Sequence, residues 1–309
     1  MSEVKYQDQV RLLLDILPDV AMEKCFAMHG GTALNLFMRD MPRLSVDIDL
    51  TYLPIQDRTT TLANIESALR SIRDRIKAKF PAIRVTEPFE IPGQAKLFCS
   101  RAGVQIKVEV NTTMRGALGE PVLLTLCERA QVAFDRFAEM RIMPTGQLYG
   151  GKICAALDRQ HPRDLFDVKY MLEHYGFSDE IKRGFLLCIL GSDRPIHEMI
   201  RPTPIDQRDT MANHFAGMTE EPFSYDEFEE TRRALIEEIN AGLTEGDRSF
   251  LISFKEGAPA WAEFGYAEFE KFPALQWKLQ NVRKLKESNP AKHGEQLAAL
   301  KERLGRAEQ

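Results

Sequence analysis

The chain has 309 residues, 44% of them hydrophobic and 28% charged, and its formal net charge is −5. This composition excludes a disordered or fibrous protein and predicts packed cores, with enough length for two modest domains. The acidic balance argues against a protein that coats nucleic acid nonspecifically. Basic clusters at residues 70–79, 152–169 and 278–286 are nevertheless compatible with an RNA substrate.

The N-terminal stretch has no basic run followed by an apolar segment and a small-residue cleavage site, so we expect no secretory signal. No apolar run approaches the roughly 18 residues that span a bilayer. We therefore expect a cytoplasmic protein without a membrane partner. The cysteines lack the spacing of zinc or redox sites, which predicts small buried apolar side chains at Cys25, Cys99, Cys127, Cys154 and Cys188.

The first predicted element is a helix over residues 6–28, where apolar side chains recur at roughly helical spacing. The sequence HGGTALNLFMRD follows, and its paired glycines and threonine lead into a second, short apolar helix. Residues 43–54 then alternate with period two, with apolar side chains on one face and Asp47, Asp49 and Thr51 on the other. That alternation predicts a strand.

A helix is expected over about residues 61–80, followed by strand candidates at residues 82–91, 95–101, 104–113 and 122–126. From Thr145 onward the period becomes helical, with a break at His161-Pro162, and strand signals almost vanish. Further helices are expected at about 224–242 and 274–286. The predicted fold is therefore mixed α and β up to residue 145 and mainly helical from 146 to 309.

Asp47 and Asp49 lie one residue apart on the predicted strand, so their side chains project from the same face. Two such carboxylates can share a hard divalent cation such as Mg²⁺, which leaves other positions for water and substrate phosphates. Nucleotidyl and phosphoryl transfer require that arrangement. An Asp-x-Asp pair alone is usually an exposed strand edge, but the apolar strand around it and the glycine loop before it favour metal binding.

A third carboxylate, Glu109, lies on the predicted strand at 104–111, on the same face as Lys107. Glu109 can point the same way as the aspartates if the two strands are neighbours. Three carboxylates would complete a two-metal site, in which one ion activates the attacking hydroxyl and the other holds the leaving pyrophosphate. The alternative is an exposed glutamate on an amphipathic edge strand.

Gly30, Gly31 and Thr32 stand where a turn becomes a helix, so free backbone N–H groups could face a phosphate. Glycine lets that backbone come close to a ligand. Taken alone, a Gly-Gly-Thr is more often a helix cap with the threonine as N-cap residue. The phosphate-binding interpretation gains support from the aspartates that follow.

Lys152 and Arg159 are seven residues apart, about two helical turns, and therefore lie on one helix face. Such a basic pair could bind a triphosphate, although exposed basic residues are ordinary on helices. Asp164 and Asp167 follow Arg163 in the first turn after a proline, where acidic residues stabilise a helix in any case. From the residues alone, this acidic pair is interpreted as structural.

Other catalytic patterns are missing from the sequence. The six histidines show no metal-binding spacing, and we assign them no role. Neither a Gly-x-Ser-x-Gly elbow nor a Walker loop is present, which disfavours serine hydrolases and P-loop kinases.

The segments HGGTALNLFMRDMPRLSVDIDLTYL and GGKICAALDRQHPRDLFDVKYML together resemble the AbiEii nucleotidyltransferase toxins, a family that includes the MenT toxins. The C-terminal FPALQWKLQNVRKLK resembles the same family more loosely, so the likeness covers nearly the whole chain. The resemblance implies a polymerase-beta-like nucleotidyltransferase domain at residues 1–145. It also implies a helical domain at residues 146–309 that completes the active-site cleft.

The resemblance further implies Mg²⁺, or Mn²⁺ in its place, as cofactor and an NTP as substrate. Carried over by motif position, the implied site residues are the metal ligands Asp47 and Asp49, the nucleotide-loop residues Gly30, Gly31 and Thr32, the catalytic residues Lys152 and Asp164, and the phosphate contacts Arg159 and Arg163. The structural interpretation of Asp164 changes accordingly. Glu109 matches the third carboxylate of the superfamily by its strand pattern alone.

Proteins similar to this one act as toxins in toxin-antitoxin pairs and add nucleotides to the 3′ end of tRNA, which blocks translation. The resemblance therefore implies an RNA substrate, in particular tRNA, and a cognate antitoxin protein as partner. Three other functions stay open: nucleotidylation of a protein hydroxyl, a nucleotide-binding regulator without catalysis, and a plain structural protein.

Overall fold

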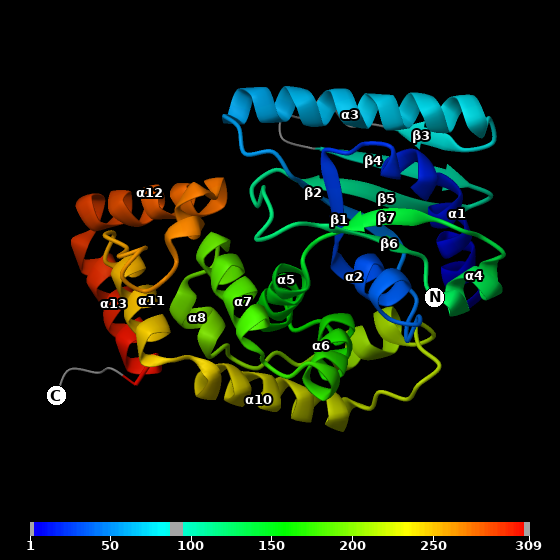
Figure 1. Ribbon diagram of the computed structural model, residues 1–309. Coiled ribbons are helices and arrows are strands. Elements are labelled where there is room, and N and C mark those ends of the chain that lie inside the picture. Colours follow the sequence, from blue (N-terminus) through cyan, green and yellow to red (C-terminus); the bar gives the residue numbers. More distant parts are fainter. Residues whose placement is uncertain (1–2, 87–94, 306–309) are drawn as a thin grey trace. The chain divides into compact units, whose positions relative to one another are not determined.

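The computed structural model describes residues 3–86 and 95–305, so the last part of the strand expected at 82–91 lies outside the described residues (Figure 1). The chain divides into two compact units. The first unit consists of residues 1–144 and 211–222, and the second of residues 145–210 and 223–309. We call residues 211–222 the return segment, because there the chain comes back to the first unit.

A single mixed sheet of seven strands forms the centre of the first unit, in the order β3-β4-β5-β2-β1-β7-β6. The strands are β1 (Phe26–His29), β2 (Asp47–Tyr52), β3 (Arg84–Thr86), β4 (Lys96–Arg101), β5 (Val104–Asn111), β6 (Val122–Thr125) and β7 (Glu139–Ile142). Strand β2 runs parallel to β5 and antiparallel to β1, and β1 runs parallel to β7. The strand that carries the Asp-x-Asp pair is therefore the middle strand of the sheet.

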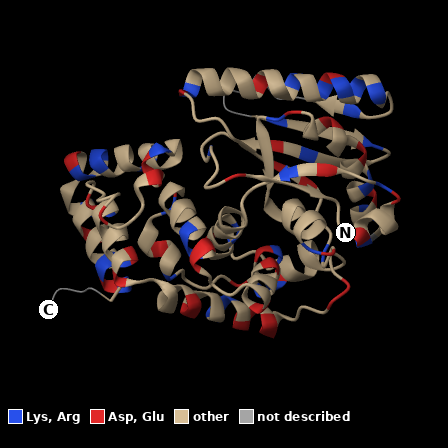
Figure 2. Ribbon diagram, viewed as in Figure 1, with Lys and Arg blue, Asp and Glu red and all other residues tan. Residues whose placement is uncertain are grey.

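Helices cover the sheet and connect its strands. In this unit they are α1 (Glu3–Ala21), α2 (Gly30–Ala33), the π-helix η1 (Leu34–Met38), α3 (Arg58–Lys79), α4 (Glu128–Phe134) and the π-helix η2 (Met211–Phe215). Helix α1 contacts β5, β7 and α3. Along α3, basic residues outnumber acidic ones (Figure 2), and Arg70 pairs with Glu66 while Arg75 pairs with Glu23. The basic cluster at 70–79 is thus partly neutralised within the unit.

The structure corrects the helix expected over residues 6–28. Helix α1 ends at Ala21, and residues 26–29 form strand β1. This short strand is hydrogen-bonded on both sides, and Phe26, Ala27 and Met28 are fully buried. A strand buried on both faces has no alternation of polar residues, so its apolar run continued the helical pattern before it. Strand β7 was not predicted either: Glu139 and Arg141 alternate with the buried Met140 and Ile142, but four residues give only two repeats of the pattern.

The second unit is helical, and no strand occurs among its described residues. Its helices are α5 (Thr145–Asp158), α6 (Pro162–His174), α7 (Asp179–Gly191), α8 (Ile196–Ile200), α9 (Arg208–Thr210), α10 (Tyr225–Gly242), α11 (Glu245–Lys255), the 3₁₀ helix η3 (Ala267–Lys271), α12 (Pro273–Ser288) and α13 (Pro290–Arg303). The predicted change from a mixed to a helical architecture is confirmed.

Helices α5 and α7 cross at very short range because glycines stand at the contact. A Cβ atom on Gly184 of α7 would lie 1.9 Å from the carbonyl oxygen of Gly146 on α5. A Cβ atom on Gly150 would lie 2.2 Å from the carbonyl carbon of Gly184. The two backbones therefore touch, which fixes α5 and its functional side chains within the unit.

Nowhere in the part of the chain that the structure describes is a helix both long enough and apolar enough to cross a bilayer.

Candidate active site

The central strands bring the predicted carboxylates of the first unit together. Strand β2 starts at Asp47, and the register pairs Asp49 with Glu109 on β5 and with His29 on β1. Asp47 pairs with Lys107 on β5. Side chains two residues apart on a strand share a face, so all three carboxylates and Lys107 project from the same side of two adjoining strands.

Lys107 sits among these carboxylates and forms an ion pair with Glu109, with 2.6 Å between Nζ and Oε2. Burial acts to lower the pKa of Lys107, but the bond to Glu109 and the charges of Glu109, Asp47 and Asp49 outweigh it and raise the pKa above its usual value. The alternating pattern of β5 predicts Lys107 on this face but indicates no function for it. Its ammonium group holds the third carboxylate.

A hollow of about 300 Å³ opens beside Asp49 and Glu109, and His29 and Asn111 line it as well. The donor set suits Mg²⁺ or Mn²⁺, because carboxylate oxygens are the ligands that such hard cations prefer. Among the described residues, however, no three His, Cys, Asp or Glu side chains converge closely enough to enclose a metal ion. Asp47, Asp49 and Glu109 as metal ligands therefore stay a prediction.

The glycine loop lies directly against this carboxylate face. Gly30 has a φ of +77°, and a Cβ atom there would lie 2.6 Å from Oδ2 of Asp49. Both the left-handed backbone and the close approach require glycine. The loop and the aspartates therefore belong to one site within the first unit.

Thr32 is the third residue of α2 and does not act as its N-cap, which corrects that alternative. Its hydroxyl lies 3.0 Å from Oγ of Ser45 and donates to the carbonyl oxygen of Asp47 at 2.5 Å. Thr32 is 1% exposed. The hydroxyl thus ties the glycine loop to the start of the strand that carries the aspartates.

In the second unit, a buried ion cluster joins α5 to α6. Nζ of Lys152 lies 2.9 Å from a carboxylate oxygen of both Asp164 and Asp167. Arg159 donates twice to Asp164 from Nε and Nη2. Burial would raise the pKa of Asp164, but the charges of Lys152 and Arg159 and their hydrogen bonds hold it well below its usual range.

The start of α6 explains how Asp164 reaches Lys152. His161 caps the helix by accepting a hydrogen bond from the backbone N–H of Arg163, and Pro162 occupies the first turn. The turn before it depends on Gln160, which is 1% exposed and has a φ of +49°. This left-handed turn places the side chains of Arg159 and Asp164 next to each other.

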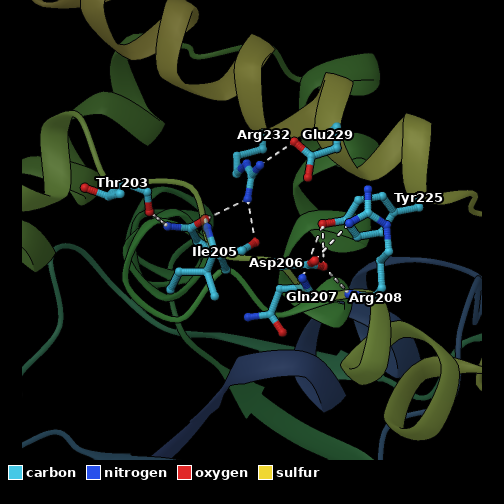
Figure 3. Close-up of polar contacts among 9 residues, drawn as sticks. Thr203, Ile205, Asp206, Gln207, Arg208, Tyr225, Glu229 and Arg232 are labelled. Carbon is cyan, nitrogen blue, oxygen red and sulfur yellow. Dashed lines mark hydrogen bonds and ion pairs between the residues drawn. The ribbon is translucent and has the colours of Figure 1, made fainter.

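A polar network around Gln160 holds that turn in place. Its side chain donates to the carbonyl oxygen of Thr203 and accepts from the backbone N–H of Ile205 and from Arg232 on α10. Arg232 also bonds the carbonyl oxygen of Ile205 and pairs with Glu229 (Figure 3). Helix α10 thereby supports the basic and acidic side chains between α5 and α6.

The structure thus collects the predicted residues into two groups, one in each unit. The first unit joins Gly30, Gly31, Thr32, Asp47, Asp49 and Glu109. The second unit joins Lys152, Arg159 and Asp164, and the half-buried Arg163 follows the cap of α6. Sequence reasoning gave no function to Lys107, Asp167 or Ser45. Lys107 shows the period-two signal of Glu109, and Asp167 lies one turn after Asp164.

Comparison with known proteins identifies relatives of this chain. A sequence profile of the family described as nucleotidyl transferase AbiEii toxin, type IV toxin-antitoxin system, matches residues 11–281. No curated protein sequence matches the chain. Among solved structures, the chain is similar to MenT4, a nucleotidyltransferase toxin from Mycobacterium tuberculosis H37Rv, with a TM-score of 0.63 and 14% identity over 89% of this chain and 93% of that one. The two proteins share a fold.

Proposed function

This chain belongs to the AbiEii nucleotidyltransferase toxin family, and from that premise we propose that it transfers a nucleoside monophosphate from an NTP to the 3′ end of an RNA, with tRNA as the acceptor. The observation that carries the proposal is the strand register that sets Asp49 beside Glu109, with Gly30 in contact with Asp49. Carboxylates next to a close backbone loop suit a metal-bound triphosphate.

Several general properties follow from the family. The protein is a nucleotidyltransferase and a toxin, and a type IV toxin-antitoxin system supplies an antitoxin as its partner. We further propose that residues 1–145 form the nucleotidyltransferase domain. Residues 146–309 are proposed to form a helical domain that completes the active-site cleft. NTPs and tRNA are cytoplasmic, so the proposed reaction places the enzyme there.

In the proposed reaction, the acceptor hydroxyl loses its proton to water, its oxygen bonds to the α-phosphorus of the NTP, and the bond from that phosphorus to the leaving pyrophosphate breaks. Asp47 and Asp49 would hold Mg²⁺ or Mn²⁺, and the bound ion would neutralise the charge that develops on the phosphates. Glu109 is the candidate third ligand. Backbone N–H groups at Gly30 and Gly31 face the triphosphate, and Thr32 fixes the distance between that loop and β2.

The cluster in the second unit supplies positive charge in this proposal. Arg159 is more than half exposed although it bonds the buried Asp164, so its guanidinium can also bind a phosphate. Lys152 is held in one position by Asp164 and Asp167. Asp164 thus acts as a positioning residue for the two cations, and Arg163 is a further proposed phosphate contact.

The test is incubation of the purified protein with total RNA, Mg²⁺ and each α-labelled NTP in turn, repeated with Mn²⁺. We expect label on tRNA from wild-type protein and a loss of at least about a thousand-fold in Asp49→Asn, because the lost charge is needed for metal binding. Asp74→Asn, on the exposed side of α3, is the control and should keep full activity. Label on protein and none on RNA would replace the RNA acceptor with a protein hydroxyl.

A further inference from the structure

We propose that the return segment positions the nucleotide loop, with Thr219 and Arg43 as positioning residues that set the affinity of the enzyme for its nucleotide. The inference rests on the proposed role of Gly30, Gly31 and Thr32 in nucleotide binding. It gives a part in nucleotide binding to Arg43 and to Thr219, which lies far from the glycines in the sequence. Neither residue is expected to touch the nucleotide.

The return segment is bonded directly to the loop that precedes β2. The backbone N–H of Leu44 donates to the carbonyl oxygen of Met218 at 2.7 Å, and Arg43 and Thr219 form an antiparallel bridge. The hydroxyl of Thr219 donates to the carbonyl oxygen of Pro42 at 3.1 Å. Three consecutive residues of the loop are therefore held by two residues of the return segment.

The return segment is itself anchored firmly enough to act as a support. Phe215 and Met218 are 3% and 1% exposed, so both belong to the core of the first unit. Glu220 pairs with Arg129 on α4 at 2.6 Å, and the backbone N–H of Arg129 bonds Asp40 at the other end of the loop. Helix α4 thus links the loop and the return segment a second time.

Arg43 connects this loop to the glycines of the nucleotide loop through direct contacts. It is 3% exposed, and its Nη1 donates to the carbonyl oxygen of Leu44 at 2.9 Å. A Cβ atom on Gly31 would lie 2.7 Å from Nη2 of Arg43 and 2.8 Å from Oγ of Ser45. The guanidinium therefore lies against the backbone of Gly31, and Ser45 contacts Thr32 next to it.

A small displacement here has a large effect on binding. Backbone N–H groups bind phosphate only within a narrow range of distance and angle. If the return segment releases residues 42–44, Arg43 moves away from Gly31. The nucleotide loop then loses the side chain against which it packs. Weaker nucleotide binding should follow.

The experiment compares Thr219→Val, which removes the hydroxyl and keeps the shape, with Thr125→Val, the same change at an exposed position of β6. A fluorescent NTP analogue is titrated onto each full-length protein with Mg²⁺ present. The Thr219 hydroxyl also accepts a hydrogen bond from the backbone N–H of Glu221 at 3.0 Å, so Thr219→Val loosens the return segment as well as its bond to Pro42. We expect affinity to fall about five-fold. For Thr125→Val we expect no change.

Arg43→Lys provides a second variant, since it keeps the positive charge and loses the planar group that lies on Gly31. We expect a fall in affinity of about ten-fold. In steady-state assays both variants should raise the KM for NTP, with the KM for RNA unchanged. Thermal unfolding of each protein is measured alongside, to separate a local effect from general destabilisation.

Unchanged nucleotide affinity in both Thr219→Val and Arg43→Lys would overturn the inference, including the case in which their unfolding temperatures fall. The titration contains no acceptor, so an error in the proposed RNA acceptor does not affect it. A wild-type enzyme that binds the nucleotide and labels no RNA would refute the proposed acceptor and leave the role of the return segment standing.

Discussion

Lys107 is a positive charge set among the carboxylates of the first unit, so it competes with any divalent cation for Glu109. Replacing it with methionine leaves Glu109 free and makes the face more negative. We expect Lys107→Met to bind Mn²⁺ about ten-fold more tightly than wild type. Titration of Mn²⁺ followed by electron paramagnetic resonance measures this directly, without turnover.

The control for this experiment is Lys77→Met, which removes an exposed charge on α3. If Lys107→Met and Lys77→Met bind Mn²⁺ equally well, Lys107 does not regulate the metal site. A combined Lys107→Met and Glu109→Gln variant should lose the gain, because the freed carboxylate is then absent.

The buried Asp164 should give the protein a pH-dependent stability. Its pKa in the folded protein is depressed, so its stabilising effect is complete above the pKa of an unfolded aspartate, about 4, and is lost as the pH falls below that value. We expect Asp164→Asn to cost about 3 kcal/mol at pH 7, since Lys152 and Arg159 lose a buried charge partner. Urea unfolding between pH 7 and pH 3 measures both proteins.

The unfolding measurements across this pH range also test whether the ionised carboxylate is the cause. The advantage of wild type over Asp164→Asn should shrink by about 1 kcal/mol as the pH falls from about 4 to 3, and further at lower pH, because the pKa of Asp164 in the folded protein lies well below 3. A stability difference that stays constant across this range would contradict the claim that the ionised form of Asp164 stabilises the fold.

At the scale of elements, the crossing of α5 and α7 depends on three glycines. Alanine at Gly184 would place its methyl group against the backbone of Gly146, so the helices must separate. We expect Gly184→Ala to destabilise the second unit by about 3 kcal/mol. Gly151 lies on the same helix as Gly146. A Cβ atom added at Gly151 would have Sγ of Cys188, at 3.9 Å, as its nearest neighbour.

Gly151→Ala should therefore be neutral, or stabilising by about 0.5 kcal/mol because alanine favours helix more than glycine does. Chemical denaturation of the two variants and wild type tests the pair. Equal stability of Gly184→Ala and Gly151→Ala would show that the close crossing does not contribute to stability.

The sequence predicts the longer strands that have one polar face and fails for the short strands β1 and β7. Strands β2 and β5 alternate, so both they and the shared face of Asp47, Asp49 and Glu109 could be predicted. Strand β1 is apolar except for its last residue, His29, and was assigned to a helix. The strand register that joins Asp49 to Glu109 depends on pairing over sixty residues, which no local pattern specifies.

The ion cluster of the second unit shows the same limit. Lys152 and Arg159 could be placed on one helix face, but their shared bond to Asp164 depends on the left-handed turn at Gln160. Glutamine carries no signal for that conformation, and its partners Thr203 and Arg232 are more than forty residues away. The family resemblance identified Asp164 where spacing alone did not.

At the scale of the whole molecule, the first unit is assembled from two separate parts of the chain. A fragment of residues 1–144 lacks Phe215 and Met218, which are buried in this unit. We expect this fragment to unfold at a lower temperature than the first unit in the intact chain, because apolar side chains around the missing pair are exposed. Circular dichroism during heating provides the measurement.

A synthetic peptide of residues 211–222 should raise the unfolding temperature of the fragment. The matched control is the same peptide with Met218→Asp, which cannot enter the core. If both peptides act equally, the return segment contributes no specific packing.

The discontinuous first unit also has a consequence for the cell that makes this toxin. A ribosome that has completed β7 at Ile142 must still add 80 residues before Pro222 is in place, which takes roughly 4 to 16 seconds at bacterial rates of synthesis. Through that interval the nascent chain has its aspartates and glycines but not the support for residues 42–44. If the return segment positions the nucleotide loop as proposed, the order of synthesis delays full nucleotide binding until most of the chain has been made.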